Sequence, residues 1–387
     1  MSQHICYVLN TDWFFLSHRV PLAAAARDAG ARVTVIAPDT GNADRIRALG
    51  FDFKPIRMSR SGTNPLEDRR LLLDLAALYE RLQPDLVHHF TIKPVIYGTL
   101  AAKRAGDVRV VNGITGLGHA FDPGLKRLPL RTLVTMLYRQ AGKHPDMRMV
   151  FQNSIDRDEF LTRGIVDASR AALIRSSGVP LDEFPYHPNP ASETPIVLLA
   201  ARMLRSKGVG AFIEAAQRHR QRGGRAQWVL AGPPDRDNPS SLSQDELEQA
   251  TREGAVRWLG NVSDMPSLMQ RATVVTLPSQ YREGVPRVLL EAAATGRPLV
   301  GTSVPGVRDI VIHGRTGLQV PTADPGALLS AVETLLADPC LRTRMGQAGR
   351  SLVEDTFSVD QVVSETLAVY DALLGRSWRT SAVVGVS

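Results

Sequence analysis

Short apolar runs alternate with longer amphipathic segments through the first half of the chain. The apolar runs predict buried strands at 4–10, 32–38, 51–56, 85–90 and 108–114. Between them, helical periodicity predicts longer helices at 65–83 and 94–105. Strands that alternate with helices in this way predict a parallel sheet that is covered by helices on both faces.

The same alternation begins again after residue 190. Strands are predicted there at 194–202, 226–233, 256–260, 272–279 and 297–303. The stretch 176–195, between the two series, is rich in Pro, Ser and Gly, and this composition predicts an interdomain linker. Because 387 residues are too many for one ordinary hydrophobic core, two domains are expected.

The pattern therefore predicts an α/β protein with two Rossmann-like, doubly wound parallel-sheet domains. We expect an N-terminal domain at 1–180 and a C-terminal domain at 190–365. The end of the last helix, 366–375, is expected to pack back on the N-terminal domain. Ligands of such sheets bind at the carboxyl ends of the strands, so we expect the site in a cleft between the two domains.

The composition is that of a globular protein, with 43% hydrophobic and 22% charged residues. No apolar run approaches the roughly 18 residues of a membrane-spanning helix, and the N-terminus lacks the pattern of a signal peptide. Cys6 and Cys340 lie in opposite halves, which indicates a reducing compartment and no disulfide framework. No Cys and His residues cluster along the chain, so we expect neither a metal site nor a cofactor.

Two cations follow the first predicted strand of the second half. Arg202 and Lys207 lie in the segment "ARMLRSKG", just before a predicted helix. Two cations at a strand end, beside the start of a helix, suit a diphosphate. On their own, Lys and Arg in a surface turn are more often solvated surface charges.

The stretch "REGVPRVLLEAAATG" has two carboxylates bracketing an apolar run. Pro286 is expected in the first turn of a helix that ends near Gly296. Glu283 then precedes the helix, and the amides of Gly284, Val285 and Arg287 are expected to bind an anion or hydroxyl groups. Glu291 lies inside the helix among apolar neighbours, where an unpaired carboxylate is costly. A ribose diol would satisfy it, and the alternative is an exposed helix residue.

These motifs together resemble a known enzyme family. The E-x7-E spacing of "EGVPRVLLE", the preceding "TLPS" and the segment "ARMLRSKGVGAFIEAA" are similar to retaining glycosyltransferase family 4. "FFLSHRVPLA" and "HHFTIKPVIYG" resemble the CapM-like subset, which acts on capsular, O-antigen and lipid-linked glycans. The resemblance extends over residues 5–375 and implies the GT-B fold, in which two Rossmann-like domains face a central cleft.

The resemblance also implies roles for particular residues. Arg202 and Lys207 would hold the diphosphate of a UDP-sugar, and Glu283 would orient the sugar, so these three would carry catalysis. The implied activity is retaining, metal-independent transfer of a hexose or N-acetylhexosamine to a polyprenyl-diphosphate-linked glycan. The remaining implied residues bind the donor or line the acceptor side: Glu291, Gly284, Val285, Pro286 and Arg287 for the donor, and His18, Lys93 and His119 for the acceptor.

The net charge of +7 is unevenly distributed, because the whole excess of Lys and Arg lies in the first 180 residues. Such an excess favours nucleic acid or an anionic membrane surface as a partner, and the alternative is a charge that serves only solubility. The chain lacks the interleaved aromatic and basic residues of a nucleic-acid platform, so we expect no nucleic acid. We expect the protein in the cytoplasm, at the inner face of the cell membrane.

A helical stretch at 124–144 shows where a membrane would bind. Its basic residues are spaced to share one helix face: Arg127, Arg131, Arg139 and Lys143. Its apolar residues share another: Leu130, Leu133, Val134, Leu137 and Ala141. A basic amphipathic helix is typical of membrane-surface binding, although a core-facing helix with a solvated outer face has the same pattern.

Other functions fit parts of the pattern. The acceptor could be a soluble sugar, the fold also hosts nucleotide-sugar 2-epimerases, and a non-catalytic nucleotide-sugar-binding subunit would share the donor residues. The Asp-Arg-Asp triplets at 156–158 and 235–237 are expected to be solvated charges rather than metal ligands.

Overall fold

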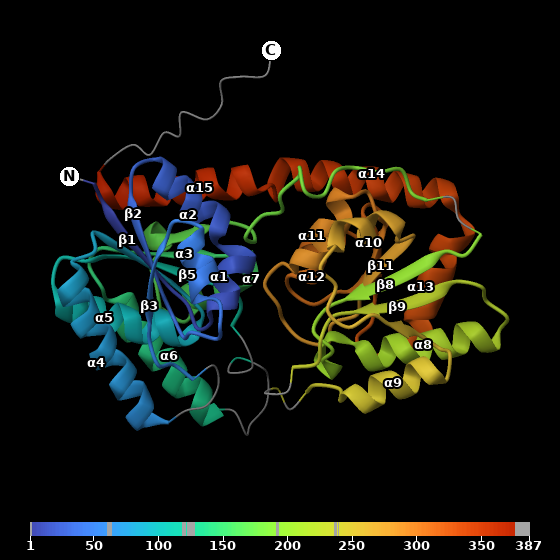
Figure 1. Ribbon diagram of the computed structural model, residues 1–387, viewed down its shortest axis with the longest axis horizontal. Coiled ribbons are helices and arrows are strands. Elements are labelled where there is room, and N and C mark those ends of the chain that lie inside the picture. The colour runs from blue at the N-terminus through green and yellow to red at the C-terminus, as the bar shows by residue number, and fades with distance from the viewer. Residues whose placement is uncertain are drawn as a thin grey trace, which may run out of the picture. The chain divides into compact units, whose positions relative to one another are not determined.

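The computed structural model describes residues 2–59, 64–117, 121, 128–190, 193–235, 238 and 240–375, and it divides the chain into two compact units (Figure 1). Unit 1 combines the chain up to Ser177 with the segment that begins at Asp360. Unit 2 runs from Gly178 to Val359.

Unit 1 is built on a seven-stranded sheet in the order β3-β2-β1-β4-β5-β6-β7, and all of its strand pairs are parallel. The strands are β1 (His4–Val8), β2 (Arg32–Ala37), β3 (Asp52–Pro55), β4 (Leu86–Phe90), β5 (Arg109–Ile114), β6 (Met147–Phe151) and β7 (Ala171–Leu173). The order reverses between β1 and β4, and in doubly wound sheets this reversal opens a crevice at the carboxyl ends of the strands.

Helices cover both faces of this sheet. They are α1 (Asp12–His18), α2 (Val20–Asp28), α3 (Ala43–Ala48), α4 (Pro65–Leu82), the π-helix η1 (Pro94–Gly98), α5 (Thr99–Ala105), α6 (Leu128–Gly142), α7 (Ser154–Thr162), the short 3-10 turn η4 (Ala168–Arg170) and α15 (Val359–Leu374). Successive strand residues face opposite sides. Accordingly Cys6 and Val8 join the core under α4 and α5, whereas Ile5 and Tyr7 join the core under α1, α2 and α15.

Unit 2 is built on a six-stranded parallel sheet in the order β10-β9-β8-β11-β12-β13. The strands are β8 (Ile196–Ala200), β9 (Gln227–Ala231), β10 (Arg257–Trp258), β11 (Val274–Leu277), β12 (Leu299–Thr302) and β13 (Gly317–Val320). Here the order reverses between β8 and β11. Leu198 and Leu199 face opposite cores, as expected for a sheet that is covered on both sides.

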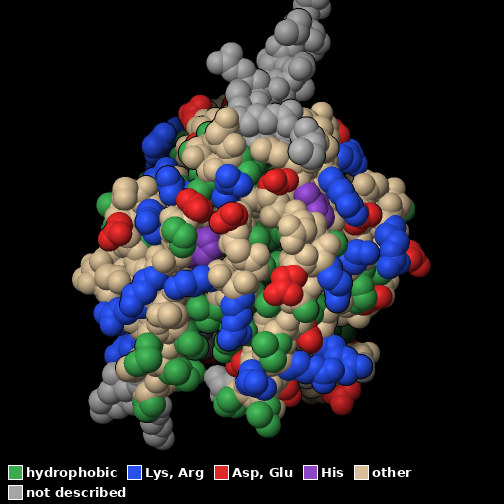
Figure 2. Space-filling model, turned by 90° about the vertical axis from the view of Figure 1, so that its left-hand side faces the viewer, with side chains coloured by type: hydrophobic (Ala, Val, Ile, Leu, Met, Phe, Trp, Pro, Cys, Tyr) green, Lys and Arg blue, Asp and Glu red, His purple; other side chains and the backbone are tan. Residues whose placement is uncertain are grey.

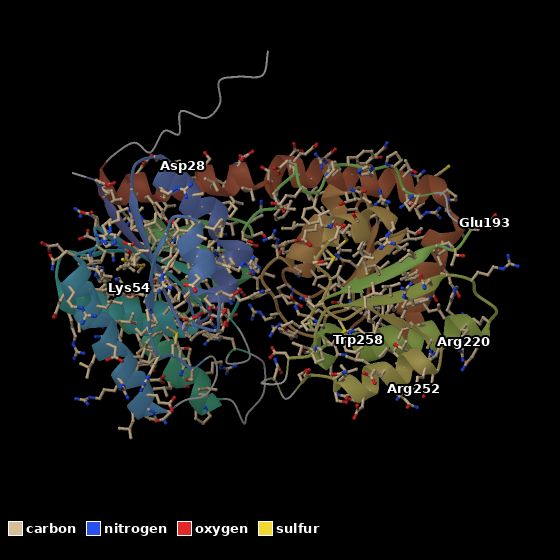
Figure 3. All side chains as sticks on the ribbon, viewed as in Figure 1. Asp28, Lys54, Glu193, Arg220, Arg252 and Trp258 are labelled. Atoms are coloured by element: carbon tan, nitrogen blue, oxygen red, sulfur yellow. The ribbon has the colours of Figure 1, made fainter. Side chains whose placement is uncertain are left out.

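Helices and one short 3-10 turn accompany the sheet of unit 2. The full set is the 3-10 turn η5 (Arg205–Lys207), α8 (Val209–Gln221), α9 (Gln244–Arg252), α10 (Met265–Arg271), α11 (Arg287–Ala294), α12 (Val307–Ile310), α13 (Pro325–Ala337) and α14 (Pro339–Thr356). Arg220 on α8 and Arg252 on α9 extend away from the sheet and are exposed (Figure 3).

The predicted α/β class with two doubly wound parallel sheets is confirmed, but two details were wrong. The strands β6, β7 and β13 were not predicted. The second domain ends at Val359 rather than 365, because α15 packs along its length on the core of unit 1 through Val362, Leu367 and Tyr370.

The predicted linker is mostly a packed part of unit 2. Val179 and Phe184 are buried in the core of unit 2, and the backbone of Val179 bonds to Phe357 and Val359. Pro and Gly in this segment therefore shape a packed connection rather than a loose one.

Within the described ranges, no helix is both long enough and apolar enough to cross a bilayer.

Candidate active site

The residues predicted to bind the donor converge on the carboxyl edge of the unit 2 sheet. Loops that follow β8, β11 and β12 lie side by side there, because these strands are neighbours in the sheet. The backbone N–H of Gln280 donates to the carbonyl of Ser206 at 2.9 Å, and the Thr302 hydroxyl donates to the carbonyl of Ser279 at 2.6 Å. The site is thus located where the strand order reverses, the usual ligand position in such sheets.

The turn η5 brings Lys207 against the loop that follows β11. The next residue, Gly208, has a left-handed backbone with φ of 80°, which allows α8 to start directly after the turn. A Cβ atom on Gly208 would lie 2.1 Å from the carbonyl oxygen of Pro278. Only glycine therefore permits this close approach of the two loops.

Lys207 and Glu283 form an ion pair between these loops. Their side chains are only 15% and 8% exposed, and the Ser279 hydroxyl donates a hydrogen bond to the other carboxylate oxygen of Glu283. The Lys207 ammonium also lies 5.6 Å from the centre of the Tyr281 ring. A buried ion pair carries a desolvation cost that its partners offset only with good geometry, so this pair fixes the position of both side chains.

Arg202 lies beside this pair in sequence but has a different partner. Its guanidinium bonds to the carboxylate of Asp235 in the loop after β9, at 2.5 Å. Arg202 is 41% exposed and Asp235 is 11% exposed. The triplet 235–237 was expected to be solvated, and for Asp235 that expectation was wrong, because Asp235 orients a candidate donor-binding arginine.

The loop that contains Glu283 and Gly284 is held by the segment after β12. The backbone N–H of Glu283 donates to the carbonyl of Pro305 at 3.2 Å. Gly306 has φ of 85°, and a Cβ atom there would lie 2.4 Å from the Glu283 carbonyl oxygen. Val285 is buried just before the helix.

The helix α11 begins one residue later than predicted. Pro286 is its N-cap, with an extended backbone, and Arg287 is the first helical residue. Pro286 makes no side-chain capping bond to the N-terminal amides of α11. These amides and the adjacent loop face the same edge of the sheet as Lys207, which is the arrangement that favours an anion at a helix N-terminus.

Glu291 has a partner on its own helix. The Arg287 guanidinium donates to its carboxylate at 2.8 Å, from one turn earlier. Glu291 is only 12% exposed. Burial raises the pKa of Glu291 above its ordinary value, Arg287 opposes this shift, and the charge of Glu183 adds to it. The reading of Glu291 as an exposed helix residue was therefore wrong.

The residues predicted to line the acceptor side, as far as they are described, lie in unit 1, after β1 and β4. His18 ends α1; its ring stacks on Phe14 at 4.6 Å and its Nδ1 is 2.6 Å from the Ser17 hydroxyl. Lys93 is largely buried in an ion pair with Asp68 at 2.8 Å and donates to the Ser59 hydroxyl at 2.8 Å. The predicted site residues His119 and Arg127 lie outside the described residues.

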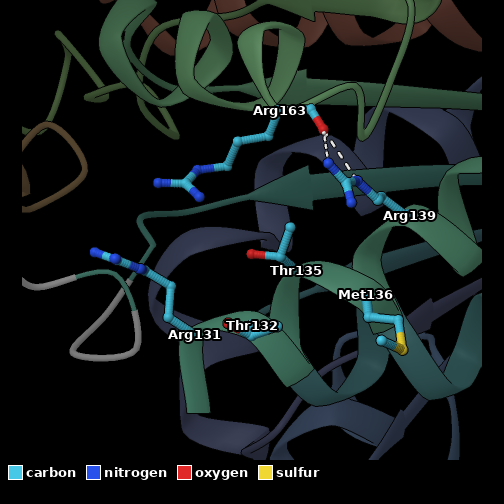
Figure 4. Close-up of a pocket in the computed structure, with 6 residues that line it drawn as sticks. All are labelled: Arg131, Thr132, Thr135, Met136, Arg139 and Arg163. Atoms are coloured by element: carbon cyan, nitrogen blue, oxygen red, sulfur yellow. Dashed lines mark hydrogen bonds between the residues drawn. The ribbon is translucent and has the colours of Figure 1, made fainter. Parts of the chain in front are cut away.

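Two of the predicted membrane-facing residues, Arg131 and Arg139, line a pocket on α6 (Figure 4). Arg131 and Arg163 extend toward the same space, and Arg139 donates two hydrogen bonds to the carbonyl of Arg163, at 3.0 and 2.7 Å. Thr135 lies between these arginines. Lys143 is exposed just after the helix.

The apolar face of α6 differs from the predicted one. Val134 and Ala141 are buried, as is the adjacent Tyr138. Leu130 and Leu133 were predicted on the same face, but they are 36% and 49% exposed, together with Met136 at 62%. Figure 2 views the side of the molecule that lies at the left of Figure 1. On the lower part of that side, where α4 and α6 lie, hydrophobic side chains are gathered among Lys and Arg.

Among the described residues, no group of three or more His, Cys, Asp and Glu side chains is arranged to hold a metal ion.

Two residues of the site were missed by sequence reasoning. Ser279 was quoted within "TLPS" but given no role, and Asp235 was assigned to solvent. The signal for Ser279 was its place between the end of a strand and Glu283, four residues later. Nothing in the local sequence pointed from Asp235 to Arg202, because these residues come from different loops.

Comparison with known proteins assigns both halves of the chain to glycosyltransferase families. Residues 194–338 match the family model described as "Glycosyl transferases group 1", and residues 4–143 match "Glycosyl transferase 4-like".

Two curated relatives and one solved structure illustrate the similarity. The chain is 28% identical to N,N'-diacetylbacillosaminyl-diphospho-undecaprenol alpha-1,3-N-acetylgalactosaminyltransferase of Campylobacter jejuni, over 93% of this chain and 98% of that protein. It is 24% identical to the capsular polysaccharide biosynthesis glycosyltransferase CapM of Staphylococcus aureus, over 80% and 82%. The crystal structure of Anabaena Alr3699/HepE in complex with UDP-glucose has a TM-score of 0.71 and 19% identity, over 94% and 99%.

Proposed function

Because this chain belongs to the family 4 glycosyltransferases of GT-B fold, we propose that it transfers a hexose or N-acetylhexosamine from a UDP-sugar to a lipid-linked glycan in polysaccharide biosynthesis. The proposed transfer retains the anomeric configuration of the donor and needs no metal ion. The observation that carries the proposal is the buried pair of Lys207 and Glu283 at the carboxyl edge of the unit 2 sheet, beside Arg202 and the N-terminus of α11.

The charges at this edge match the charges of the reaction. The bond between the anomeric carbon and the diphosphate breaks, so the sugar gains positive charge and the diphosphate gains negative charge. Arg202, Lys207 and the amides of α11 would stabilise the leaving diphosphate. These positive groups are the reason for proposing a metal-independent reaction.

The anomeric configuration is retained if the acceptor hydroxyl attacks the anomeric carbon on the same face of the sugar from which the diphosphate leaves. A diphosphate oxygen then takes the proton of that hydroxyl as the new bond to the anomeric carbon forms. Glu283 would orient the donor sugar and stabilise its positive charge, while Lys207 shifts from Glu283 toward the diphosphate. Glu291 would accept hydrogen bonds from the two hydroxyls of the ribose.

Two observations support a UDP-sugar and a lipid-linked acceptor. The Anabaena neighbour was solved with UDP-glucose, and the Campylobacter relative is named for a diphospho-undecaprenol acceptor. The pocket lined by Arg131, Arg139 and Arg163, next to the exposed apolar residues of α6, suits an anionic membrane surface. We accordingly propose a peripheral position at the inner face of the cell membrane.

The test is transfer from a panel of nucleotide sugars to isolated lipid-linked sugars, in the presence and absence of EDTA. Glu283→Gln should lower kcat at least ~100-fold while UDP affinity changes little. The matched control is Glu214→Gln, a half-exposed glutamate that pairs with Arg218 on α8.

Three outcomes would contradict the proposal: equal turnover by Glu283→Gln, inversion of the anomeric configuration in the product, or loss of activity with EDTA that a divalent metal restores. Transfer only to water-soluble sugars would replace the proposed acceptor class.

A further inference from the structure

A small hollow lies at the carboxyl edge of the unit 1 sheet, where its strand order reverses between β1 and β4. It is lined by Arg19 between α1 and α2, by His88 and Phe90 of β4, and by Gly113 and Ile114 of β5. The loops after β5, β6 and β7 contribute Thr115, Gln152 and Ser176, and α15 contributes Val362 and Thr366. In doubly wound sheets this position is where ligands bind.

Arg19 is the unexplained residue of this hollow. It is only 6% exposed, and its Nε atom is buried without a hydrogen-bond partner. Within the described ranges, its guanidinium bonds to no carboxylate and no carbonyl. Burial lowers the pKa of Arg19 to about 10, so the side chain stays positively charged at neutral pH.

Aromatic contacts offset only part of the cost of this buried charge. The guanidinium lies 4.1 Å from the centre of the Phe90 ring and 5.5 Å from that of Phe14. A cation–π contact contributes roughly 2 kcal/mol when desolvated, whereas burying an ion costs several kcal/mol. A buried arginine without an anionic partner is therefore poorly explained as a structural residue.

The other polar groups of the hollow do not neutralise Arg19. The Nδ1 atom of His88 lies 2.7 Å from the Tyr370 hydroxyl, and its Nε2 atom is buried without a partner. Burial, with Arg19 and His89 adding to the effect, lowers the pKa of His88 well below its ordinary value. His88 is thus neutral, and it brings no negative charge to the hollow.

Gly113 keeps the hollow open. A Cβ atom there would lie 2.8 Å from the Phe90 ring and 3.3 Å from His88 Nε2. The hollow has a volume of about 20 Å³, which is room for roughly one water molecule. A sugar ring is too large for this space, whereas the terminal oxygens of an anionic group are not.

We propose that this hollow binds an oxyanion of the acceptor, with Arg19 as the residue that carries the positive charge. The planar guanidinium group of an arginine can donate paired hydrogen bonds to two oxygens of either a phosphate or a carboxylate group. The oxyanion is then either the phosphate of a lipid-linked acceptor or the carboxylate of an acidic sugar. This inference rests on the proposed function, because it assigns one end of the acceptor to unit 1.

The test measures anion binding by isothermal titration calorimetry on the full chain saturated with UDP, so that the donor site is occupied. Inorganic diphosphate and glucuronate are titrated separately, which distinguishes the two sources. Arg19→Met should weaken binding of the recognised anion roughly 10- to 100-fold. Arg19→Lys should have an intermediate effect, because it keeps the positive charge but lacks the planar guanidinium group. The matched control is Arg104→Met, at an exposed position on α5 of the same unit.

Thermal unfolding gives a second readout. If Arg19 is kept for binding, Arg19→Met removes an uncompensated buried charge, so the melting temperature stays the same or rises. The proposal is overturned if neither anion binds to the UDP-saturated protein, if Arg19→Met binds as the wild type does, or if Arg19→Met only lowers the melting temperature. UDP affinity, measured first, tests the donor site of the proposed function separately from Arg19.

Discussion

The two carboxylates of the candidate active site are held in different ways. Glu283 has a cation and a hydroxyl group on its two oxygens, from Lys207 and Ser279. Glu291 faces Arg287 on its own helix, and burial raises its pKa. Glu283 is therefore well compensated in the absence of a ligand, whereas Glu291 gains from a further hydrogen-bond donor.

The raised pKa of Glu291 predicts a pH-dependent stability. The folded-state pKa lies above the unfolded value of about 4.5. The contribution of this carboxyl group to the free energy of unfolding is therefore fully present below pH 4.5 and is lost as pH rises through the folded-state pKa. The glutamine of Glu291→Gln cannot ionise. The melting temperature of this variant minus that of the wild type should therefore increase from pH 4 to pH 8. It should also weaken UDP binding by about tenfold.

The control for this prediction is Glu214→Gln, whose carboxylate is half exposed. Melting temperatures are measured by calorimetry across the pH range. A difference between Glu291→Gln and wild type that does not change with pH would contradict the assignment, and unchanged UDP affinity would remove Glu291 from the ribose site.

Short turns between strands and helices position the charged groups. Gly208 allows η5 to lie against the loop after β11, and Gly306 allows the segment after β12 to lie against Glu283 and Gly284. Both glycines have positive φ and contact backbone atoms closely. The geometry of the site thus depends on loop packing as much as on the charged residues themselves.

A pair of glycine variants tests this dependence. Gly208→Ala should destabilise the protein by roughly 1–3 kcal/mol and lower kcat, because its Cβ atom would displace η5 and Lys207. Gly210→Ala is the matched control: Gly210 lies inside α8 with open space around it, so alanine should stabilise by about 0.5–1 kcal/mol. Urea unfolding and transfer assays check both variants, and equal stability of the two would contradict the packing argument.

Helix α6 has both a buried face and an exposed apolar one. Val134, Tyr138 and Ala141 pack into unit 1, whereas Leu130, Leu133 and Met136 are exposed beside the arginine-lined pocket. The core-facing and membrane-surface interpretations of the sequence are therefore compatible. The exposed leucines favour the membrane surface, because apolar side chains among cations are typical of interfacial helices.

Charge reversal on α6 tests the membrane proposal. Replacing Arg131, Arg139 and Lys143 by Glu should strongly reduce sedimentation with anionic liposomes, since each basic residue near such a surface contributes about 1 kcal/mol, and should leave UDP affinity intact. The control reverses three exposed arginines of unit 2: Arg220, Arg225 and Arg252. Unchanged sedimentation of the α6 variant would contradict membrane binding through this helix.

The chain returns to its first unit at its C-terminal end. Residues of α15 complete the core that lies over β1 and β4, where the Tyr370 hydroxyl contacts His88 and Tyr7. Unit 1 is therefore made from two segments that lie far apart in the sequence. Its stability depends on a helix that follows the whole of unit 2.

A variant of Tyr370 tests this dependence. Tyr370→Ala should cost about 3–5 kcal/mol, because Tyr370 is fully buried, and hydrogen exchange should increase in β1 and β4 rather than in β8 and β11. Tyr370→Phe should cost about 1–3 kcal/mol through the loss of its hydroxyl group. Ser364→Ala, at an exposed position of α15, is the control, and a uniform increase in exchange over both units would contradict the expectation.

Hydrophobic periodicity predicted most of the fold, because a parallel sheet covered on both faces needs nearly continuous apolar strands. The strands β1, β2, β4, β8 and β11 were recovered within a few residues. The strand β7 was missed because it is short and only half-buried. The strand β13 was missed because it is also short and two of its residues are half-buried. The end of unit 2 was misplaced because the pattern of α15 shows an apolar face without showing which sheet it covers.

The sequence by itself determined that this chain is a two-domain α/β protein and that Arg202, Lys207, Glu283 and Glu291 are its candidate donor-binding residues. Hydrophobic periodicity is a local property and suffices for the two domains, whereas the donor-binding residues were assigned through the resemblance of their motifs to a known family. Only the tertiary structure decided the partners: Lys207 with Glu283, Arg202 with Asp235, and Arg19 with no anion among the described residues. Parallel strands bring distant loops to one edge of the sheet, so these contacts depend on strand order, which no local pattern contains.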